Sequence, residues 1–200
     1  MPIEEKLYTI EEFLKIAQLR ENENKRLELI GGAIKVIPPS KSIDSVVGAR
    51  IAYFIGNYVD EHGIGYVTGA GGGYQLGPNT ILTPNVGCIS KERAGGLDGM
   101  MFSVAPDVAV EVVSAGEAAS HMLAKGRASL RAGIYLYAGT YAVWAVDSVT
   151  KVIDVYSLAD NNTIHSEEID INGVLDGGII LPGFSLAVKE IFKGLEDADH

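Results

Sequence analysis

Two predicted strands each carry polar side chains that could take part in metal chemistry. In ILTPNVGCIS (81–90), Asn85 stands where the chain enters a strand. In APDVAVEVVS (105–114), Asp107 stands at the entrance and Glu111 inside the strand. Mg²⁺ prefers hard oxygen ligands, commonly one or two carboxylates with water, and the amide of Asn85 is a weaker, neutral ligand. The pattern indicates either a nuclease-type site that has lost an acid or an ordinary strand entrance.

Glu111 is the more demanding of the two acids in the second strand. Residues two apart on a strand share a face, so Asp107 and Glu111 are predicted to point the same way. Asp107 follows a proline and can cap a turn or meet solvent. Glu111 lies in an apolar run, where an acid is costly unless it is paired, hydrogen-bonded or metal-bound. Two interpretations stay open: an active-site acid, or half of a buried ion pair with Arg50 or Arg131.

Other residue types that carry chemistry are sparse. Phosphodiester cleavage needs a positive group near the developing charge, or one that activates water. The helix-compatible region after Glu111 offers Lys125, Arg127 and Arg131, although each of them, taken singly, is better interpreted as a solvated helix residue. The four histidines show no metal-ligand spacing. Cys88 suits a buried strand better than a nucleophile, and GAGGG lacks the Lys-Ser/Thr and helix start of a phosphate-binding P-loop.

The elements that must position these residues follow an order typical of an α+β fold with a mixed sheet. Thr9 and Glu12 form a capping box before a helix that is predicted to run to about Arg20. Two β-prone runs around glycines 31–32 predict a hairpin over 26–37. Together these segments precede the strongest helix of the chain.

That helix is predicted over 42–62, with Ser42 as its N-cap. Its small residues Gly48, Ala52 and Gly56 recur at every fourth position, which would allow close packing on a sheet or on a second copy. Beyond it we expect a central strand at 107–114, a helix within 117–138, and strands at 140–147, 151–158 and 163–171.

Composition sets the protein class. The 200 residues, 47% hydrophobic and 21% charged, predict one globular domain over 1–200. The net charge of -10 argues against strong non-specific nucleic-acid binding, although 16 lysines and arginines leave room for a basic patch. The acidic tail 194–200 is predicted to be a solvated, disordered end. A single cysteine, Cys88, and the lack of targeting or membrane-spanning patterns predict a soluble cytoplasmic protein with no membrane partner.

The chain resembles the Uma family of restriction-endonuclease-like proteins, in the PD-(D/E)XK nuclease superfamily. The likeness runs nearly end to end through seven segments in the same order. They are YTIEEFL (8–14), RLELIGGAIKVIPPS (26–40), LGPNTILTPNV (76–86), APDVAVEVVS (105–114), AGTYAVWAVD (138–147), VIDVYSL (152–158) and LPGFSLAVKEIF (181–192). The resemblance implies an α+β restriction-endonuclease-like core, in which a mixed β-sheet is flanked by helices.

The resemblance also implies a site. The family takes one acid from a Pro-Asp strand, one Glu from the next long strand and a lysine from the helix after it. The matching positions here are Asn85, Glu111 and a cation that the sequence leaves open. Glu28 of RLELIGG matches a further family acid that would support the site.

The cation is open because the stretch from Glu111 to Gly139 is several residues longer than the family pattern. Counting forward from Glu111 places the lysine at Lys125, and counting back from Gly139 places it at Arg131. Those two positions lie about 120° apart around a helix, so both cannot face one site. Arg131 could stabilise charge but could not act as a base.

Two further departures accompany Asn85. The Ser-Pro-Ser turn of the family is Ser114-Ala115-Gly116 here, and Ile43 stands where the family often has a histidine. Loss of one carboxylate should weaken metal binding and slow hydrolysis. Changes at several places favour a degenerate relative over a retuned enzyme.

Two functions follow as expectations. The first is a Mg²⁺- or Mn²⁺-dependent DNA endonuclease in which Glu111 binds metal and Asn85 is a weak neutral ligand. Lys125 would activate water or stabilise the phosphate, and Glu28 or Asp107 would supply the missing charge. The second is a non-catalytic binding or regulatory module that retains the fold. We favour a nuclease-like protein of reduced or lost activity, with DNA and a second copy of the chain as candidate partners.

Overall fold

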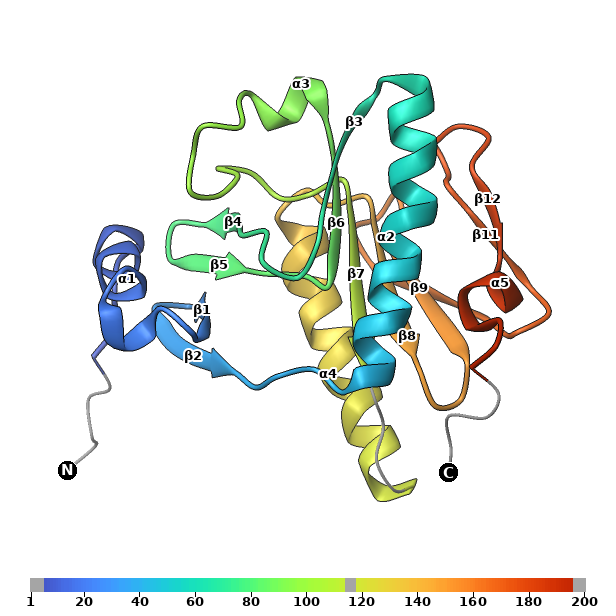
Figure 1. Ribbon diagram of the computed structural model, residues 1–200, viewed down its shortest axis with the longest axis horizontal. Helices are drawn as coiled ribbons and strands as arrows, with labels where there is room; N and C mark the ends of the chain where they lie inside the picture. The colour runs from blue at the N-terminus through green and yellow to red at the C-terminus, as the bar shows by residue number, and fades with distance from the viewer. Residues whose placement is uncertain (1–5, 114–117, 196–200) are drawn as a thin grey trace.

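The computed structural model describes residues 6–113 and 118–195, and for 118–124 the backbone alone. At its centre is a six-stranded sheet in which β7 and β8 are parallel and every other neighbouring pair is antiparallel. In sheet order, the strands are β10 (Ile164–Ile169), β9 (Val152–Leu158), β8 (Ala142–Asp147), β7 (Val108–Val113), β6 (Val86–Ser90) and β3 (Gly65–Thr68) (Figure 1). The predicted mixed sheet is confirmed.

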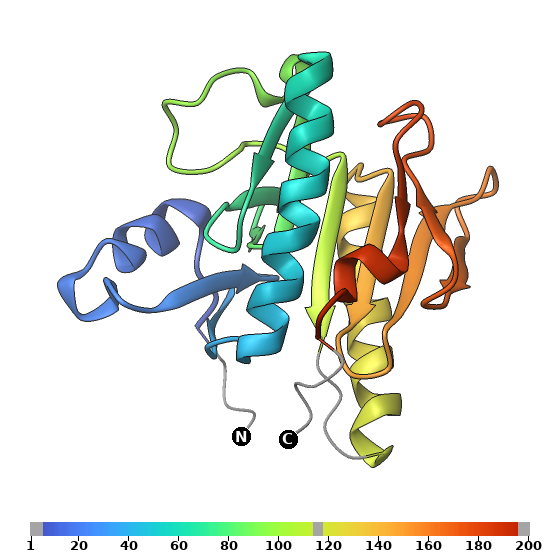
Figure 2. The same ribbon diagram turned by 45° about the vertical axis from the view of Figure 1, so that its right-hand side comes forward.

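One long helix covers each face of this sheet. Helix α2 (Ser42–His62) lies on one face, and α4 (Ala118–Tyr137) lies on the other (Figure 2). Strand β7 is buried between them: Val108 and Val110 pack in the core on the α2 side, and Ala109 packs in the core on the α4 side. Apolar residues on both faces are typical of a central strand, as the sequence predicted.

A four-stranded antiparallel sheet lies beside the first. Its strands, in sheet order, are β2 (Ala33–Ile37), β1 (Arg26–Ile30), β5 (Thr80–Leu82) and β4 (Tyr74–Gly77). The predicted hairpin joins β1 to β2 through Gly31 and Gly32, whose positive φ angles of 57° and 86° favour glycine. Because β5 leads directly into β6, the chain between them links the two sheets.

The remaining elements are short. They are α1 (Ile10–Ala17), a 3₁₀ turn at Arg20–Asn22, α3 (Lys91–Ala94), β11 (Val174–Asp176), β12 (Ser185–Ala187) and α5 (Val188–Phe192). Leu175 of β11, Leu186 of β12 and Ile191 of α5 join the core on the α2 side of the large sheet. These C-terminal elements therefore complete the layer that α2 begins.

Two helix ends differ from the prediction. The capping box is present, since Thr9 and Glu12 exchange hydrogen bonds of 3.0 and 3.2 Å, but α1 ends at Ala17. The Asn22 side chain donates to the Ile16 carbonyl at 2.9 Å, which satisfies an acceptor at the early end. Ser42 is not the N-cap of α2: Lys41 occupies that position without a side-chain bond.

The small residues of α2 have unequal roles. A Cβ atom at Gly48 would meet the side chains of Asn85 and Val112 at 3.8 Å, so α2 lies directly over the strands that carry the candidate site. A Cβ atom at Gly56 would meet no atom within 4 Å. Close packing on the sheet therefore accounts for Gly48.

None of the described helices combines the length and apolar character that a bilayer crossing requires. The predicted turn at 114–116 and most of the predicted disordered tail, 196–200, lie outside the described residues.

Candidate functional site

Glu28, Glu111, Arg131 and Tyr135 meet where the two sheets approach α4, and we call these four residues the Arg131 cluster. Strand β1 carries Glu28, β7 carries Glu111, and α4 carries the other two. Glu28, Glu111 and Tyr135 are buried, and the Arg131 side chain retains 22% of its exposure. Asn85, between β5 and β6, lines the same cavity as Glu111 and Arg131.

Arg131 bridges the two acids of the cluster. Its Nη1 and Nη2 donate to the two carboxylate oxygens of Glu28 at 2.8 and 3.1 Å. Nη2 also donates to Oε1 of Glu111 at 2.7 Å, and the Tyr135 hydroxyl donates to the same oxygen at 2.8 Å. A planar guanidinium suits this role because it can hold one carboxylate with two parallel bonds and still reach a second.

Glu28 is held from its other side by Thr83. The backbone N–H and the hydroxyl of Thr83 donate to Oε1 of Glu28 at 2.9 and 3.0 Å. Arg26 in turn donates through Nε to the Thr83 hydroxyl oxygen at 2.7 Å and through Nη2 to the Thr83 carbonyl. Glu28 is fully buried, so these bonds replace the water that its carboxylate would otherwise bind, and they hold the carboxylate in place.

Asn85 extends the pairing between β6 and β7. The ladder between the two strands covers Val86 to Cys88 on β6, opposite Val110 to Val108 on β7. Just past that ladder, the backbone N–H of Val112 donates to Oδ1 of Asn85 at 2.9 Å. The side chain therefore serves as a backbone acceptor beside Glu111.

The structure does not bring Asp107 to the cluster. Asp107 precedes β7 and accepts from the Ser90 backbone N–H at 2.5 Å and from the Arg93 guanidinium. Glu111 stands four positions further along the chain, which corresponds to about 13 Å along an extended strand. The shared face was predicted from alternation alone, and alternation says nothing about this distance.

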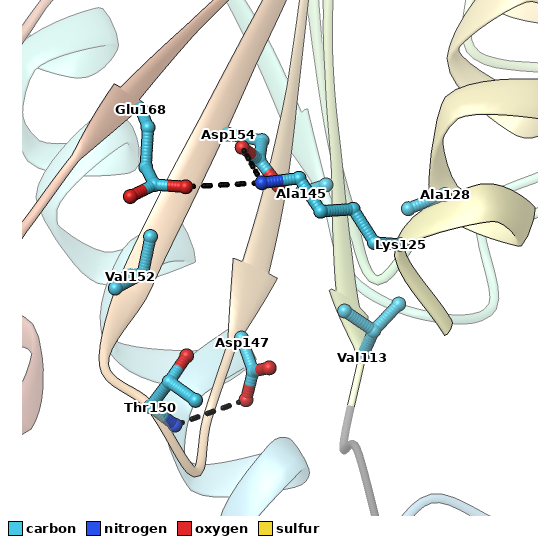
Figure 3. A pocket seen from close by; sticks show the side chains of 9 residues that line it. All are labelled: Val113, Lys125, Ala128, Ala145, Asp147, Thr150, Val152, Asp154 and Glu168. Atoms are coloured by element: carbon cyan, nitrogen blue, oxygen red, sulfur yellow. Dashed lines mark hydrogen bonds and ion pairs between the residues drawn. The ribbon is translucent and has the colours of Figure 1, made fainter. Parts of the chain in front are cut away.

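Lys125 also lies away from Glu111. Its ammonium contacts Asp154 at 3.1 Å and Glu168 at 3.0 Å, beside a small cavity of about 230 Å³ (Figure 3). Glu111, Ala145, Asp154 and Glu168 stand in one row across β7, β8, β9 and β10. Asp154 is thus two strands from Glu111, or about 10 Å, and Lys125 reaches over the far strands.

Of the two cations left open by the sequence, the structure places Arg131 beside Glu111 and Glu28. The alternative pair with Arg50 does not form, because Arg50 Nη1 donates to the carbonyls of Ile191 and Lys193. Tyr135 was not among the residues predicted from the sequence. Its spacing could have indicated it, since residues four apart on a helix share a face and Tyr135 is four residues after Arg131.

Burial and the cation act differently on the two acids. For Glu28, burial is the largest single influence and raises the pKa, but Arg131 and Thr83 together outweigh it and the pKa lies below its ordinary value. For Glu111, burial dominates and the pKa is raised, against the opposing effects of Arg131 and Tyr135. Burial and the Glu111 carboxylate both raise the pKa of Tyr135.

These opposite pKa shifts predict opposite pH dependences of stability. Folded Glu28 binds fewer protons than unfolded Glu28 below its ordinary pKa of 4.5, so its stabilisation is present above that pH and lost as the pH falls through the folded pKa. Folded Glu111 binds more protons than unfolded Glu111 above pH 4.5, so stability falls as the pH rises through its folded pKa.

We expect Glu28→Gln to reduce the slope of stability against pH below 4.5, and Glu111→Gln to reduce the slope above pH 4.5. Urea unfolding at a series of pH values measures both slopes, and a wild-type slope retained in both variants would contradict the assignment.

A cavity of about 360 Å³ opens onto one side of the cluster. Arg26, Lys41, Asp44, Asn85, Glu111 and Arg131 contribute its charged and amide groups. Where side chains are described, at 6–113 and 125–195, no three His, Cys, Asp or Glu residues form a group suited to a metal ion. Two carboxylates border the cavity, and both are already engaged: Glu111 by a guanidinium and a phenol, and Asp44 by the Ser148 hydroxyl, which donates to its Oδ1 at 2.6 Å.

Comparison with known proteins agrees with this architecture. A crystal structure titled as that of "a putative nuclease belonging to DUF820" from Anabaena variabilis superimposes with a TM-score of 0.75 at 20% sequence identity, covering 96% of this chain and 98% of that chain. No curated protein matches the chain. The sequence pattern of Uma2, a family described as "Putative restriction endonuclease", matches residues 10–189. The chain thus belongs to the Uma2 family.

Proposed function

We propose that this chain is a nuclease-like protein in which an ion-pair cluster replaces the metal-dependent phosphodiesterase site, so that hydrolysis is lost or strongly reduced. The observation that carries the proposal is the position of Arg131, which bridges Glu28 and Glu111. The family resemblance assigns metal-site roles to the positions of Asn85 and Glu111 and places a lysine on the helix. Arg131 of that helix is the cation that contacts Glu111.

The chemistry of an arginine differs from that of the lysine it would replace. A guanidinium stays protonated at all accessible pH values, so it cannot take a proton from water. It also holds two carboxylates at once, whereas an ammonium is a compact charge with no planar fork. Arg131 is therefore suited to neutralising Glu28 and Glu111, and unsuited to activating a nucleophile.

The donor set does not fit a divalent cation in this arrangement. Mg²⁺ takes carboxylate oxygens and water in octahedral geometry. The oxygen Oε1 of Glu111 already accepts two hydrogen bonds, and Oδ1 of Asn85 and Oδ1 of Asp44 accept one each. A cation at Glu111 would also face the positive charge of Arg131, 2.7 Å from that carboxylate, and like charges at such range repel strongly in a partly buried site. This arrangement therefore does not support metal-dependent hydrolysis.

The active-endonuclease alternative would need a second cation at Glu111. Lys125 is the candidate from the sequence, and its ammonium is engaged by Asp154 and Glu168 on strands β9 and β10. Asp107, the candidate for the missing charge, is paired with Arg93. A binding or regulatory role on the retained nuclease fold is compatible with all of these contacts.

Calorimetric titration of Mn²⁺ and a plasmid-nicking assay test the proposal. Wild-type protein is expected to release no heat of specific Mn²⁺ binding and to nick plasmid no faster than Glu111→Gln, the matched control that keeps shape and removes charge. Stoichiometric Mn²⁺ binding together with nicking, both abolished by Glu111→Gln, would show a working nuclease and end the proposal.

A further inference from the structure

Strand β10 is an open edge of the large sheet. It is the last strand in the order, and residues 164–168 are exposed. Its pairing with β9 runs over six residues without a break, from Ile164 opposite Leu158 to Ile169 opposite Ile153. Proteins often protect such edges with charged side chains, prolines or bulges. The strand IHSEEI has no proline and no bulge, and its charged side chains are those of Glu167 and Glu168.

The direction of its free backbone groups can be assigned. Ala159 N–H donates to the Thr163 carbonyl at 2.9 Å, so the backbone of Thr163 faces β9. In an antiparallel strand this direction alternates from residue to residue. The N–H and C=O groups of Ile164, Ser166 and Glu168 therefore point away from the sheet.

The side chains of β10 also alternate between faces. Glu168 contacts Lys125 of α4, and Ile164 lies 3.4 Å from the position of a Cβ atom at Gly133 of α4. Even-numbered residues therefore share the α4 face. His165 and Glu167 share the opposite face.

We propose that a second copy of this chain docks on β10 as an antiparallel strand, which joins two large sheets into one across a two-fold axis at Ser166. A two-fold axis perpendicular to the sheet keeps the α4 face of one copy level with the α4 face of the other. Residues opposite each other across the axis must then be both even-numbered or both odd-numbered, because side chains alternate between faces. The axis must therefore pass through one residue, which lies opposite the same residue of the partner subunit.

Charge selects Ser166 as that residue. A centre at Glu167 or Glu168 would place two glutamates directly opposite each other, which is unfavourable. A centre at His165 would leave Glu167 opposite Thr163. A centre at Ser166 places His165 opposite Glu167 of the partner subunit, and does so twice because of the symmetry.

The backbone directions agree with this register. Ser166 points away from β9, so Ser166 and the partner's Ser166 form a hydrogen-bonded pair, as do Ile164 and the partner's Glu168. His165 and the partner's Glu167 then form non-hydrogen-bonded pairs, in which side chains approach most closely. An imidazole N–H can donate to the carboxylate there whether or not the ring is charged.

Sedimentation equilibrium of the full chain over a concentration series tests the proposal. Wild-type protein is expected to dimerise, and Ser166→Pro to lower the association constant by about tenfold or more, because two hydrogen bonds across the axis are lost. Proline should leave the pairing with β9 intact, since the Ser166 N–H faces outward. Ser166→Ala, which keeps the N–H, is the matched control, and unchanged thermal unfolding shows that each variant folds.

Cysteine crosslinking tests the register. Ser166→Cys is expected to form a disulfide dimer under oxidation, because hydrogen-bonded pairs have Cα atoms about 5.5 Å apart, within the range for disulfides. Ile164→Cys should not, since in this register the two copies of that residue are offset by four positions, or about 13 Å along the strands. Cys88 is buried and stays out of the assay.

Three results would overturn the proposal. They are a monomeric wild type at every concentration, a dimer that Ser166→Pro leaves unchanged, and equal crosslinking of both cysteine variants. The second result would direct attention to the groove of about 490 Å³ that Tyr53 and Phe54 of α2 line with Glu190 of α5.

Discussion

Replacing Arg131 with methionine is expected to lower the free energy of unfolding by about 3–5 kcal/mol. The methionine fills much of the same volume but leaves Glu28 and Glu111 buried without a counter-charge. Most of that cost comes from leaving two buried carboxylates without a counter-charge, and less comes from the loss of their attraction to Arg131. A buried charge that has lost its partner has no compensation for its desolvation. Urea unfolding at neutral pH measures the loss.

Lys125→Met provides the control for this experiment. Lys125 of α4 also contacts two acids, but its own side chain is 45% exposed, against 22% for Arg131, and the side chains of Glu168 and Asp154 are 61% and 14% exposed. Because the lysine stays partly solvated and Glu168 is exposed, Lys125→Met should lower stability by only about 1 kcal/mol. Equal losses in the two variants would contradict the view that burial makes Arg131 special.

A compensated variant separates charge from packing. Glu28→Met and Glu111→Leu, added to Arg131→Met, remove every charge of the bridge together, and such exchanges are often neutral or stabilising. Most of the loss should therefore be recovered. If Arg131→Met does not fold at all, recovery of folding in this triple variant still tests the same statement.

The fold was predictable because local rules decide most of it. Glycines 31–32 fixed the hairpin, since the turn needs positive φ angles that other residues disfavour. The helical spacing of apolar residues predicted α2, and unbroken apolarity predicted the central position of β7. The ends of helices were less certain: Asn22, five residues beyond the end of α1, takes part in ending that helix.

The candidate site was predictable only in part. Glu111 stood out as an acid inside an apolar strand, and Glu28 was found through the family resemblance; in the structure, one guanidinium contacts both. The cation stayed open because counting along a chain of altered length gives two answers and does not fix the phase of α4. Lys125 and Arg131 each contact two acids. Only the folded sheet shows that Arg131 contacts the candidate-site acids Glu28 and Glu111.

Asp107 shows why alternation alone misleads. Its parity on the strand matches that of Glu111, but its partner is Arg93, which α3 delivers from 14 residues earlier in the chain. No local pattern in APDVAVEVVS predicts the contact between Asp107 and Arg93. Long-range partners of this kind come from the packing of α3 beside the strand ends, which the sequence pattern does not specify.

The double variant Asn85→Asp, Arg131→Lys is expected to bind Mn²⁺ at least about tenfold more tightly than the wild type or either single variant. Aspartate at 85 would add a further carboxylate to the cavity that Glu111 and Asp44 already line. Lysine at 131 would keep a positive charge near Glu28 but cannot hold both acids with a planar fork. Each change removes a different obstacle, so the effect of the pair should exceed the sum of the single effects.

Binding should be measured without reference to catalysis. Calorimetry gives the affinity, and thermal unfolding gives an independent value because Mn²⁺ at a hundred times its Kd adds about 2.7 kcal/mol to the stability of the folded protein. The matched control adds Glu111→Gln to the double variant. This change removes the Glu111 carboxylate, which is present in the wild type and in the double variant alike. Mn²⁺ binding that survives this control lies elsewhere on the acidic surface. A double variant that binds no better than the wild type would mean that the Arg131 cluster is not a modified metal site, even if the wild type neither binds Mn²⁺ nor cleaves DNA.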